Sequence, residues 1–253
     1  MTTIIEAIIL GIIQGITEWL PVSSSGHLVI AQQWLGLEVP VIFDILLHLG
    51  SLAVVLFIFH KDIIKLCRGV LRRESYFLQY AAGLVVATIP IGLVGVFLND
   101  IVKQAFGSLQ AVGYGLLFTA AILFLSKYPK TKDKNLSWTS MIGIGALQAI
   151  AILPGVSRSG MTISAGLMQG VDREQSGRFS FLLFIPAILG ATVVEFRNFT
   201  KIGEIMPLLI GVITTMIVGY FSLTWLLKML KKDNFNVFAW YCLAVGIGIL
   251  VLM

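Results

Sequence analysis

The chain has 253 residues, of which 57% are hydrophobic and only 12% are charged. This composition excludes an ordinary soluble globule, in which about a quarter of the residues are charged, and indicates a polytopic membrane protein. The formal net charge of +5 is not a nucleic-acid signal, because the cations lie in short stretches beside apolar segments instead of on one folded face.

The first half of the chain is predicted to contain one broken apolar segment and three spans. Residues 1–20 are apolar, end in a serine–glycine break and are followed by a short apolar run at 28–37. They include Glu6 and lack a basic stretch or cleavage site, so we expect mature structure and not a secretory signal. Because a span needs about 20 mostly apolar residues, we then predict membrane-spanning helices at 42–60, 76–98 and 109–126.

The second half follows the same order. Residues 139–153 are apolar, break at a serine–glycine segment and continue as a short apolar run at 163–170. Three further stretches predict membrane-spanning helices at 179–194, 205–227 and 237–253. Six full transmembrane helices and two broken segments are therefore expected.

Charged loops predict the orientation of these spans. The basic stretches, which we expect in the cytoplasm, are 61–73, 127–134 and 228–232. The loops with one and two cations, expected outside, are 99–108 and 195–204. We expect each broken segment to be a re-entrant hairpin, the first entering from outside and the second from the cytoplasm, since irregular backbone in hydrocarbon needs burial by protein. The alternative is two complete crossings with both breaks at the membrane surface.

The two breaks belong to an internal repeat. Residues 14–26 and 148–160 have the same length, and Ser23-Ser24-Ser25-Gly26 aligns with Ser157-Arg158-Ser159-Gly160. The opening span of the first half is followed by a basic loop and its counterpart is not, which predicts an inverted repeat. The expected fold is an all-α polytopic membrane protein with one integral-membrane domain, 1–253. Its parts are a first repeat 1–126, a cytoplasmic connecting loop 127–138 and a second repeat 139–253.

Arg158 is an unusual residue for an apolar segment. A charge at bilayer depth costs about 2.5 kcal/mol or more and normally marks a ligand or ion site. A guanidinium, hydroxyls and backbone amides at a helix start form a phosphate-recognition set. The alternative is an arginine that extends its charge to the membrane surface. The predicted substrate-binding residues of this second break are Gly155, Ser157, Ser159 and Thr162.

The first break combines a carboxylate, hydroxyls and an imidazole. Gln14 and Glu18 are four residues apart and share a helix face directed toward the following turn. The turn carries Ser23, Ser24 and Ser25, followed by His27. Glu18 as an interfacial carboxylate and His27 as a structural histidine are the alternatives. Helix capping by the serines is compatible with anion binding, because both use the same exposed N–H groups.

These motifs resemble a known family. Gln14-xxx-Glu18, Pro21-Val-Ser-Ser-Ser-Gly-His27 and Pro154-Gly-Val-Ser-Arg-Ser-Gly-Met-Thr162 are similar to the signature motifs of the undecaprenyl-diphosphate phosphatase (bacitracin-resistance) family. The resemblance implies a membrane hydrolase that removes the terminal phosphate of a C55 polyprenyl diphosphate and recycles the lipid carrier of cell-wall polymers. It also implies re-entrant hairpins, a homodimer in the inner (cytoplasmic) membrane, and an active site that opens to the outer side.

The resemblance further implies a divalent cation, Mg²⁺ or Ca²⁺. The family admits Glu or Gln at the first position of its first motif, and this chain has Gln14, so Glu18 is the only carboxylate and the predicted metal ligand. Cys67 and Cys242 are too few and too different in setting for a thiolate site. A second class of membrane lipid phosphatases, with His and Asp at fixed spacings after Ser-Arg, is excluded because Ser164 and Met168 stand there.

The predicted roles leave the nucleophile open. We assign catalysis to Glu18, Ser24, His27 and Arg158, and substrate binding also to Gln14, Ser23 and Ser25. Glu18 is expected to orient His27 or to hold the cation, and the nucleophile is His27, Ser24 or water. Asp44 and His48, one helical turn apart, are predicted to support the site or to satisfy each other locally. Arg173 and Arg178 are predicted interfacial anchors. The competing function is a transporter or flippase of the carrier lipid or an anion, which also uses inverted repeats.

Overall fold

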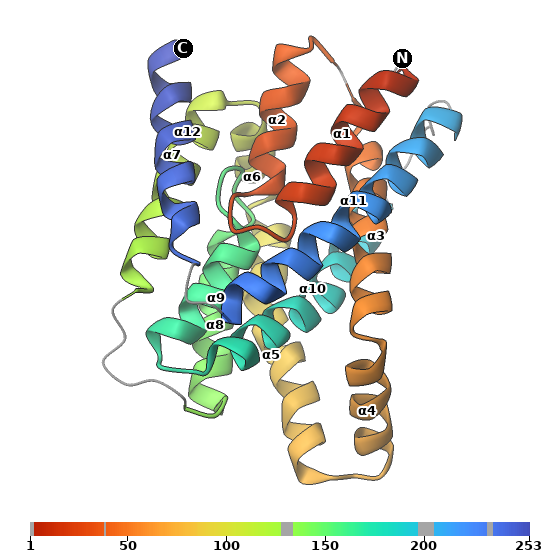
Figure 1. The fold of residues 1–253 in the computed structure, drawn as a ribbon, viewed down its shortest axis with the longest axis vertical. Helices are drawn as coiled ribbons and strands as arrows, with labels where there is room; N and C mark the ends of the chain where they lie inside the picture. The colour runs from red at the N-terminus through yellow and green to blue at the C-terminus, as the bar shows by residue number, and fades with distance from the viewer. Residues whose placement is uncertain (1–2, 38, 128–133, 197–204, 232–234) are drawn as a thin grey trace.

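A computed structural model describes residues 3–37, 39–127, 134–196, 205–231 and 235–253 (Figure 1). This part of the chain is α-helical, with a single isolated β-bridge between Lys134 and Val171. The helices are α1 Ile4–Thr17, α2 Ser24–Trp34, α3 Val41–Ile58, α4 His60–Leu71, α5 Ser75–Phe97, α6 Asn99–Phe106, α7 Leu109–Leu125, α8 Trp138–Ile150, α9 Arg158–Met168, α10 Arg173–Phe196, α11 Ile205–Lys231 and α12 Val237–Leu252. The all-α prediction is confirmed for these residues.

Both predicted breaks are turns between paired helices. Helix α1 runs into the molecule and α2 returns to the same end, while α8 and α9 form a second pair whose turn also lies in the interior (Figure 1). The Ser159 Oγ donates to the Leu20 carbonyl oxygen at 3.1 Å, so the two turns meet. The sequence therefore places its two polar segments side by side.

The helices after the breaks begin at Ser24 and Arg158, several residues before the apolar runs at 28–37 and 163–170, and serines cap them. The Ser23 Oγ accepts from the Gly26 N–H at 3.3 Å, and the Ser157 Oγ accepts from the Gly160 N–H at 3.1 Å. This is ordinary N-capping, which lets a helix begin at a polar residue. Ser23 reaches it through a positive φ of 70°.

Three described helices are long and apolar enough to cross a membrane, namely α5, α10 and α11. Two pairs, α3 with α4 and α6 with α7, bend by 74° and 100° and raise the number to five if each pair is one span. The sixth predicted span forms α12, which has only 16 residues. Helix α10 begins at Arg173, earlier than predicted, because the Asp172 carboxylate accepts from the Gln175 N–H at 2.9 Å and caps a polar first turn.

Two predicted loops are helices. The stretch 61–73 is mostly α4, and 99–108 is mostly α6. In α4, Ile63, Leu66 and Val70 recur at helical spacing, so one face is apolar although the whole segment is charged. Most of the predicted loops 127–134 and 195–204 lies outside the described residues. The predicted loop 228–232 is helical up to Lys231, where it forms the last turn of α11.

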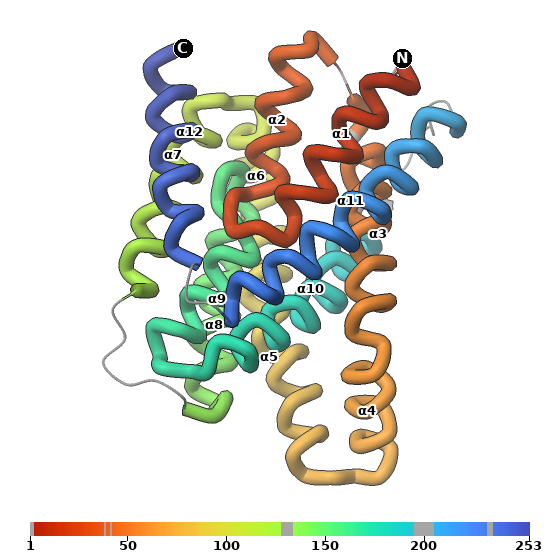
Figure 2. Tube along the Cα trace, in the orientation of Figure 1, coloured from red at the N-terminus to blue at the C-terminus, as the bar shows by residue number. Residues whose placement is uncertain are grey.

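Glycines allow helices of the two halves to pack closely (Figure 2). A Cβ on Gly11 of α1 would lie 2.6 Å from the Gly211 carbonyl oxygen of α11. A Cβ on Gly145 of α8 would lie 2.6 Å from the Ala87 Cα of α5. Such contacts are possible only between small residues, and they let backbones approach where hydrocarbon supplies no hydrophobic driving force. Each hairpin is thus held against a long helix of the other half.

Candidate active site

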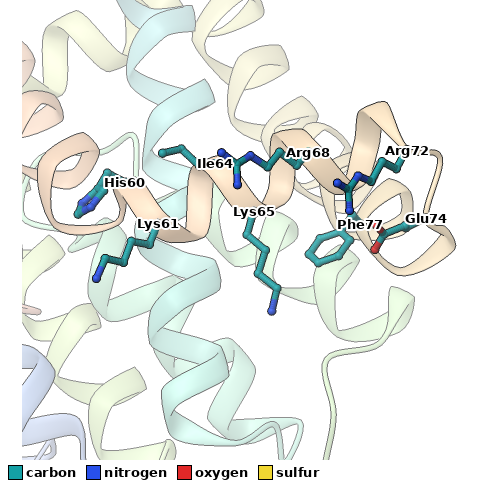
Figure 3. A pocket seen from close by; sticks show the side chains of 9 residues that line it. His60, Lys61, Ile64, Lys65, Arg68, Arg72, Glu74 and Phe77 are labelled. Carbon is teal, nitrogen blue, oxygen red and sulfur yellow. The ribbon is translucent and has the colours of Figure 1, made fainter.

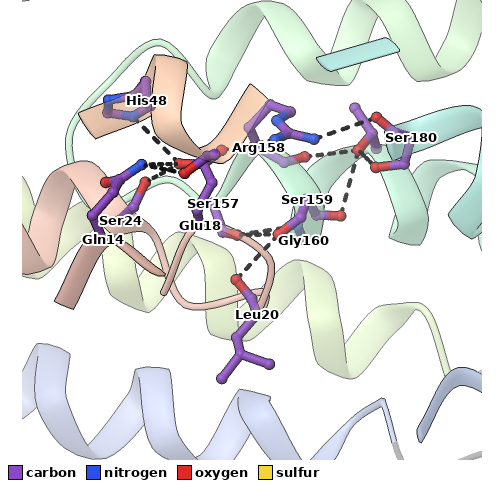
Figure 4. A network of polar contacts seen from close by, with 12 residues as sticks. Gln14, Glu18, Leu20, Ser24, His48, Ser157, Arg158, Ser159, Gly160 and Ser180 are labelled. Atoms are coloured by element: carbon purple, nitrogen blue, oxygen red, sulfur yellow. Dashed lines mark hydrogen bonds and ion pairs between the residues drawn. The ribbon is translucent and has the colours of Figure 1, made fainter. Parts of the chain in front are cut away.

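The Glu18 carboxylate, at the C-terminal end of α1, is the centre of a buried polar cluster (Figure 4). Its Oε1 accepts from Arg158 Nη2 at 2.7 Å. Its Oε2 accepts from Ser24 Oγ at 2.6 Å and from Gln14 Nε2 at 3.1 Å, and it lies 3.3 Å from His48 Nε2. Helices α1, α2, α3 and α9 therefore each bring one or more polar groups to a single carboxylate.

Arg158 is the first residue of α9 and carries the positive charge of the cluster. Its side chain is 12% exposed, and the Glu18 side chain is 6% exposed. The Arg158 Nη1 also donates to the Ser180 carbonyl oxygen at 3.3 Å, and the guanidinium lies 4.4 Å from the centre of the Phe184 ring. A guanidinium has five N–H donors, so these contacts leave donors for phosphate oxygens.

Ser24 is the predicted catalytic hydroxyl that the structure brings to the carboxylate. It lies on α2, six residues after Glu18, and its 2.6 Å contact is among the shortest in the cluster. A carboxylate at this distance from a hydroxyl has the reach that general-base catalysis needs. Ser24 is paired with Glu18, and the predicted alternative of His27 as its base does not match this geometry.

His27 lies away from Glu18, and here the predicted orientation of His27 by Glu18 is wrong. The His27 Nδ1 is 2.8 Å from the Ser23 carbonyl oxygen, and its Nε2 is 2.8 Å from the Tyr241 hydroxyl of α12. The two rings are stacked, with centres 5.7 Å apart and planes at 13°. On α2 the Ser24 and His27 side chains therefore contact different helices. Tyr241 lies in an apolar segment without a motif, so no sequence pattern pointed to it.

His48 takes the place at Glu18 that was predicted for His27. Its Nδ1 is 2.7 Å from the Asp44 carbonyl oxygen, so its partner on α3 is the backbone and not the Asp44 carboxylate. The Asp44 carboxylate instead accepts from Gln32 Nε2, at 2.9 and 3.2 Å. The predicted Asp44–His48 pair is thus divided. His48 belongs to the cluster, and Asp44 joins α3 to α2 through a glutamine that the sequence did not single out.

The remaining predicted binding residues mostly shape the turns. Ser159 donates to Leu20, and the Thr162 Oγ1 donates to the Arg158 carbonyl oxygen at 2.8 Å and lies 2.6 Å from Ser180 Oγ. Ser23 and Ser25 hydroxyls are 3.2 Å apart. These hydroxyls therefore hold the segments that carry Ser24 and Arg158, and their predicted contact with substrate stays a prediction.

Gly155 also has a packing role. Its φ is 84°, and a Cβ there would overlap the Val112 carbonyl oxygen of α7. Its own carbonyl oxygen accepts from Thr119 Oγ1 at 3.0 Å, and the same Thr119 oxygen accepts from the Ser157 N–H at 3.0 Å. Thr119, inside an apolar helix, was not predicted, yet it fixes the turn that leads to Arg158.

Outside the cluster, the two arginines predicted as interfacial anchors lie at the start of α10. Arg178 is exposed and ion-paired, with Asp62 at 2.7 Å and with Glu174 at 2.8 Å. Both arginines were predicted to lie at a membrane boundary, which stays a prediction.

The donor set does not fit a divalent cation held by the protein alone. In the described part of the chain, no three His, Cys, Asp or Glu side chains gather as a metal site would require. Both Glu18 oxygens already accept hydrogen bonds, and the guanidinium of Arg158 occupies the place where a cation would bind. Within this cluster, the buried side-chain oxygen without a hydrogen-bond partner is Gln14 Oε1. The predicted Mg²⁺ or Ca²⁺ stays a prediction.

Comparison with known proteins places this geometry in a family. Residues 7–248 match the family model described as bacitracin resistance protein BacA. Undecaprenyl-diphosphatase of Methanobrevibacter smithii is 43% identical, over 96% of this chain and 95% of its own. The undecaprenyl-diphosphatases of Methanosphaera stadtmanae and Carboxydothermus hydrogenoformans are 38% and 39% identical, and each match covers at least 96% of both chains. These matches include both helical hairpins, and the chain belongs to the bacitracin resistance protein BacA family.

Proposed function

We propose that this protein hydrolyses undecaprenyl diphosphate to undecaprenyl monophosphate and inorganic phosphate. The observation that carries the proposal is the Ser24–Glu18–Arg158 arrangement, in which a hydroxyl and a guanidinium approach the two oxygens of one buried carboxylate. The names of the full-length relatives support the same substrate and reaction. Undecaprenyl monophosphate is the form that can carry further cell-wall precursors, so the reaction recycles the carrier.

In the proposed mechanism Ser24 is the nucleophile. As its Oγ attacks the terminal phosphorus, its proton passes to Glu18, which lies 2.6 Å away. The bond between that phosphorus and the bridging oxygen breaks, and undecaprenyl monophosphate leaves with the proton that Glu18 had accepted, which restores the carboxylate. Water then attacks the phosphorylated Ser24, with Glu18 as base, releasing phosphate and restoring the hydroxyl. His27 is less favoured as the first nucleophile, because the imidazole beside Glu18 belongs to His48. Water is less favoured because the Ser24 hydroxyl already lies at the Glu18 oxygen that would act as base.

Arg158 neutralises charge in this mechanism. Phosphoryl transfer is catalysed mainly by positioning and by electrostatic stabilisation of the charged oxygens. A guanidinium is suited to this because its planar N–H groups match phosphate oxygens. Without substrate, the negative charge of the Glu18 carboxylate offsets the free-energy cost of burying the Arg158 guanidinium. Helices α2 and α9 begin at Ser24 and Arg158, and the free N–H groups of their first turns add to the positive field at the site.

The proposal includes six full spans and two re-entrant hairpins in the inner membrane, with the site opening outward. It is supported by the interior turns of α1–α2 and α8–α9, and by both chain ends lying at the end opposite the basic α4 (Figure 1). If that basic end is cytoplasmic, as the positive-inside rule predicts, the first hairpin opens outside. The homodimer implied by the family is part of the same proposal, and light scattering of the purified protein tests it.

Phosphate release tests the hydrolase. Purified protein given a short-chain prenyl diphosphate should release phosphate, and Arg158→Gln should abolish release. The matched control is Arg178→Gln, which removes an exposed arginine that also has carboxylate partners. If the unaltered protein releases no phosphate with any divalent cation but moves the lipid between leaflets, the hydrolase proposal is wrong. No observation here specifically favours transport.

A further inference from the structure

A groove along α4 is a second polar site, on a part of the molecule that the proposed mechanism does not use (Figure 3). Its volume is about 530 Å³, within the range of small-ligand pockets. Besides His60, Ile64 and Gly69, the wall consists of four cations, one carboxylate and one phenylalanine ring. They are Lys61, Lys65, Arg68, Arg72, Glu74 and Phe77. The groove is thus strongly cationic.

The cations form one stripe that the fold leaves uncompensated. They are spaced four, three and four residues apart, so they follow one side of α4, where like charges repel and weaken the helix. Asp62, the other acidic residue nearby, is paired with Arg178 of α10. Within the described ranges none of the four cations forms an ion pair, so an anionic ligand would relieve this repulsion.

The groove also has an apolar side. The Phe77 ring packs over Gly69, where a Cβ would overlap it, and Lys65 Nζ lies 5.8 Å from the ring centre. Ile64, which also lines the groove, is 46% exposed. The preceding α3 is apolar, and the following α5 is a candidate span that begins at Ser75. The groove therefore lies between an apolar helix and a candidate span, and it combines cations with exposed hydrocarbon.

We propose that this groove binds the phosphate headgroup of an anionic phospholipid in the leaflet that α4 faces. Neighbouring cations suit the phosphate, and the Phe77 ring and Ile64 suit the glycerol and acyl segments. A free phosphate ion explains the groove less well. It is only a few times larger than a water molecule, whose share of liquid volume is about 30 Å³, and it would leave most of the groove unfilled.

Lipid retention tests the proposal without measuring catalysis. The protein is purified from detergent containing equal amounts of phosphatidylglycerol and phosphatidylcholine, and retained lipid is quantified by mass spectrometry. The unaltered protein should retain phosphatidylglycerol preferentially. Lys65→Gln/Arg68→Gln should lower that preference about fivefold or more, since each cation near an anionic surface contributes measurably. The matched control, Lys127→Gln/Lys228→Gln, removes two exposed cations elsewhere and should retain the preference.

Three results would overturn the proposal. The first is that the unaltered protein shows no preference for phosphatidylglycerol. The second is that the control variant loses as much of this preference as the groove variant. The third is that millimolar inorganic phosphate displaces the lipid from the unaltered protein. The last result would assign the groove to free phosphate. Size-exclusion chromatography and phosphate release verify that both variants are folded, so a failure of the proposed hydrolase and a failure of this site remain distinguishable.

Discussion

Replacing Glu18 with Gln tests whether one carboxylate both balances Arg158 and activates Ser24. The substitution keeps the shape of the side chain and its hydrogen-bonding oxygen but removes the charge that lies 2.7 Å from the guanidinium. Because both side chains are almost fully buried, the small contribution that a surface ion pair makes to stability does not apply here. Leaving a buried charge without its partner costs about 3–5 kcal/mol. We expect the lower end, since the amide oxygen can still accept from Arg158.

The same substitution removes the proposed base. A positioned general base contributes about 10²–10⁴-fold to a rate, so phosphate release by Glu18→Gln should fall by at least about a hundredfold. Unfolding by denaturant in mixed micelles, followed by tryptophan fluorescence, measures stability, and release of phosphate from a short-chain prenyl diphosphate measures activity. The double variant Glu18→Gln/Arg158→Met should recover stability, because neutral replacement of a buried ion pair is often tolerated, and should stay inactive.

Two results would refute this reasoning. If Glu18→Gln is as stable as the unaltered protein, Arg158 does not depend on this carboxylate. If it releases phosphate within tenfold of the unaltered rate, Glu18 is not the base, and Ser24 is activated by another group.

Three further predictions use matched pairs. Ser24→Ala should abolish phosphate release, whereas Ser126→Ala, whose hydroxyl donates to the Leu123 carbonyl oxygen of α7, should retain most of it; release by Ser24→Ala at the unaltered rate would exclude Ser24 as nucleophile. Tyr241→Phe removes the hydroxyl beside His27 and should lower the free energy of unfolding by about 1 kcal/mol, while Tyr114→Phe, an exposed site, should change it little. Gly145→Ala forces a Cβ against the α5 backbone and should destabilise the protein in the same unfolding assay, whereas Gly248→Ala meets open space and should not.

The sequence predicted the parts of the site that depend on local patterns. Gln14 and Glu18 share a helix face as their spacing required, and the serines cap the helices that follow. The contact between Glu18 and Arg158 was expected only as two halves of one site, since residues 140 positions apart give no local signal. Their meeting follows from the packing of the two hairpin turns.

The contacts of the two histidines differ from those predicted, because they depend on packing between helices. His27 follows three serines and therefore invited a catalytic role, but its direction from α2 is set by Tyr241 of α12. His48 lies in an apolar stretch, and its approach to Glu18 depends on how α3 crosses α1. The count of six spans stays a prediction, since three described helices, or five with each bent pair as one span, are long and apolar enough to cross a membrane. Hydropathy does not distinguish a straight span from two helices bent by 74° or 100°, and it cannot detect an amphipathic helix such as α4 in a charged loop.

The predicted repeat explains why this cluster is tolerated in an apolar molecule. The two turns share a capping hydrogen bond, since Ser23 Oγ and Ser157 Oγ each accept from the N–H three residues on, although their φ values differ, at 70° and −77°. At the aligned positions, however, the first half has Glu18 and Ser24 where the second has Ile152 and Arg158. If both halves carried the same charge, two like charges would face each other in a low-dielectric interior, which is strongly unfavourable. Because one half supplies the carboxylate and the other the guanidinium, their charges compensate each other without substrate. A diphosphate can then compete for the guanidinium while the carboxylate remains at Ser24.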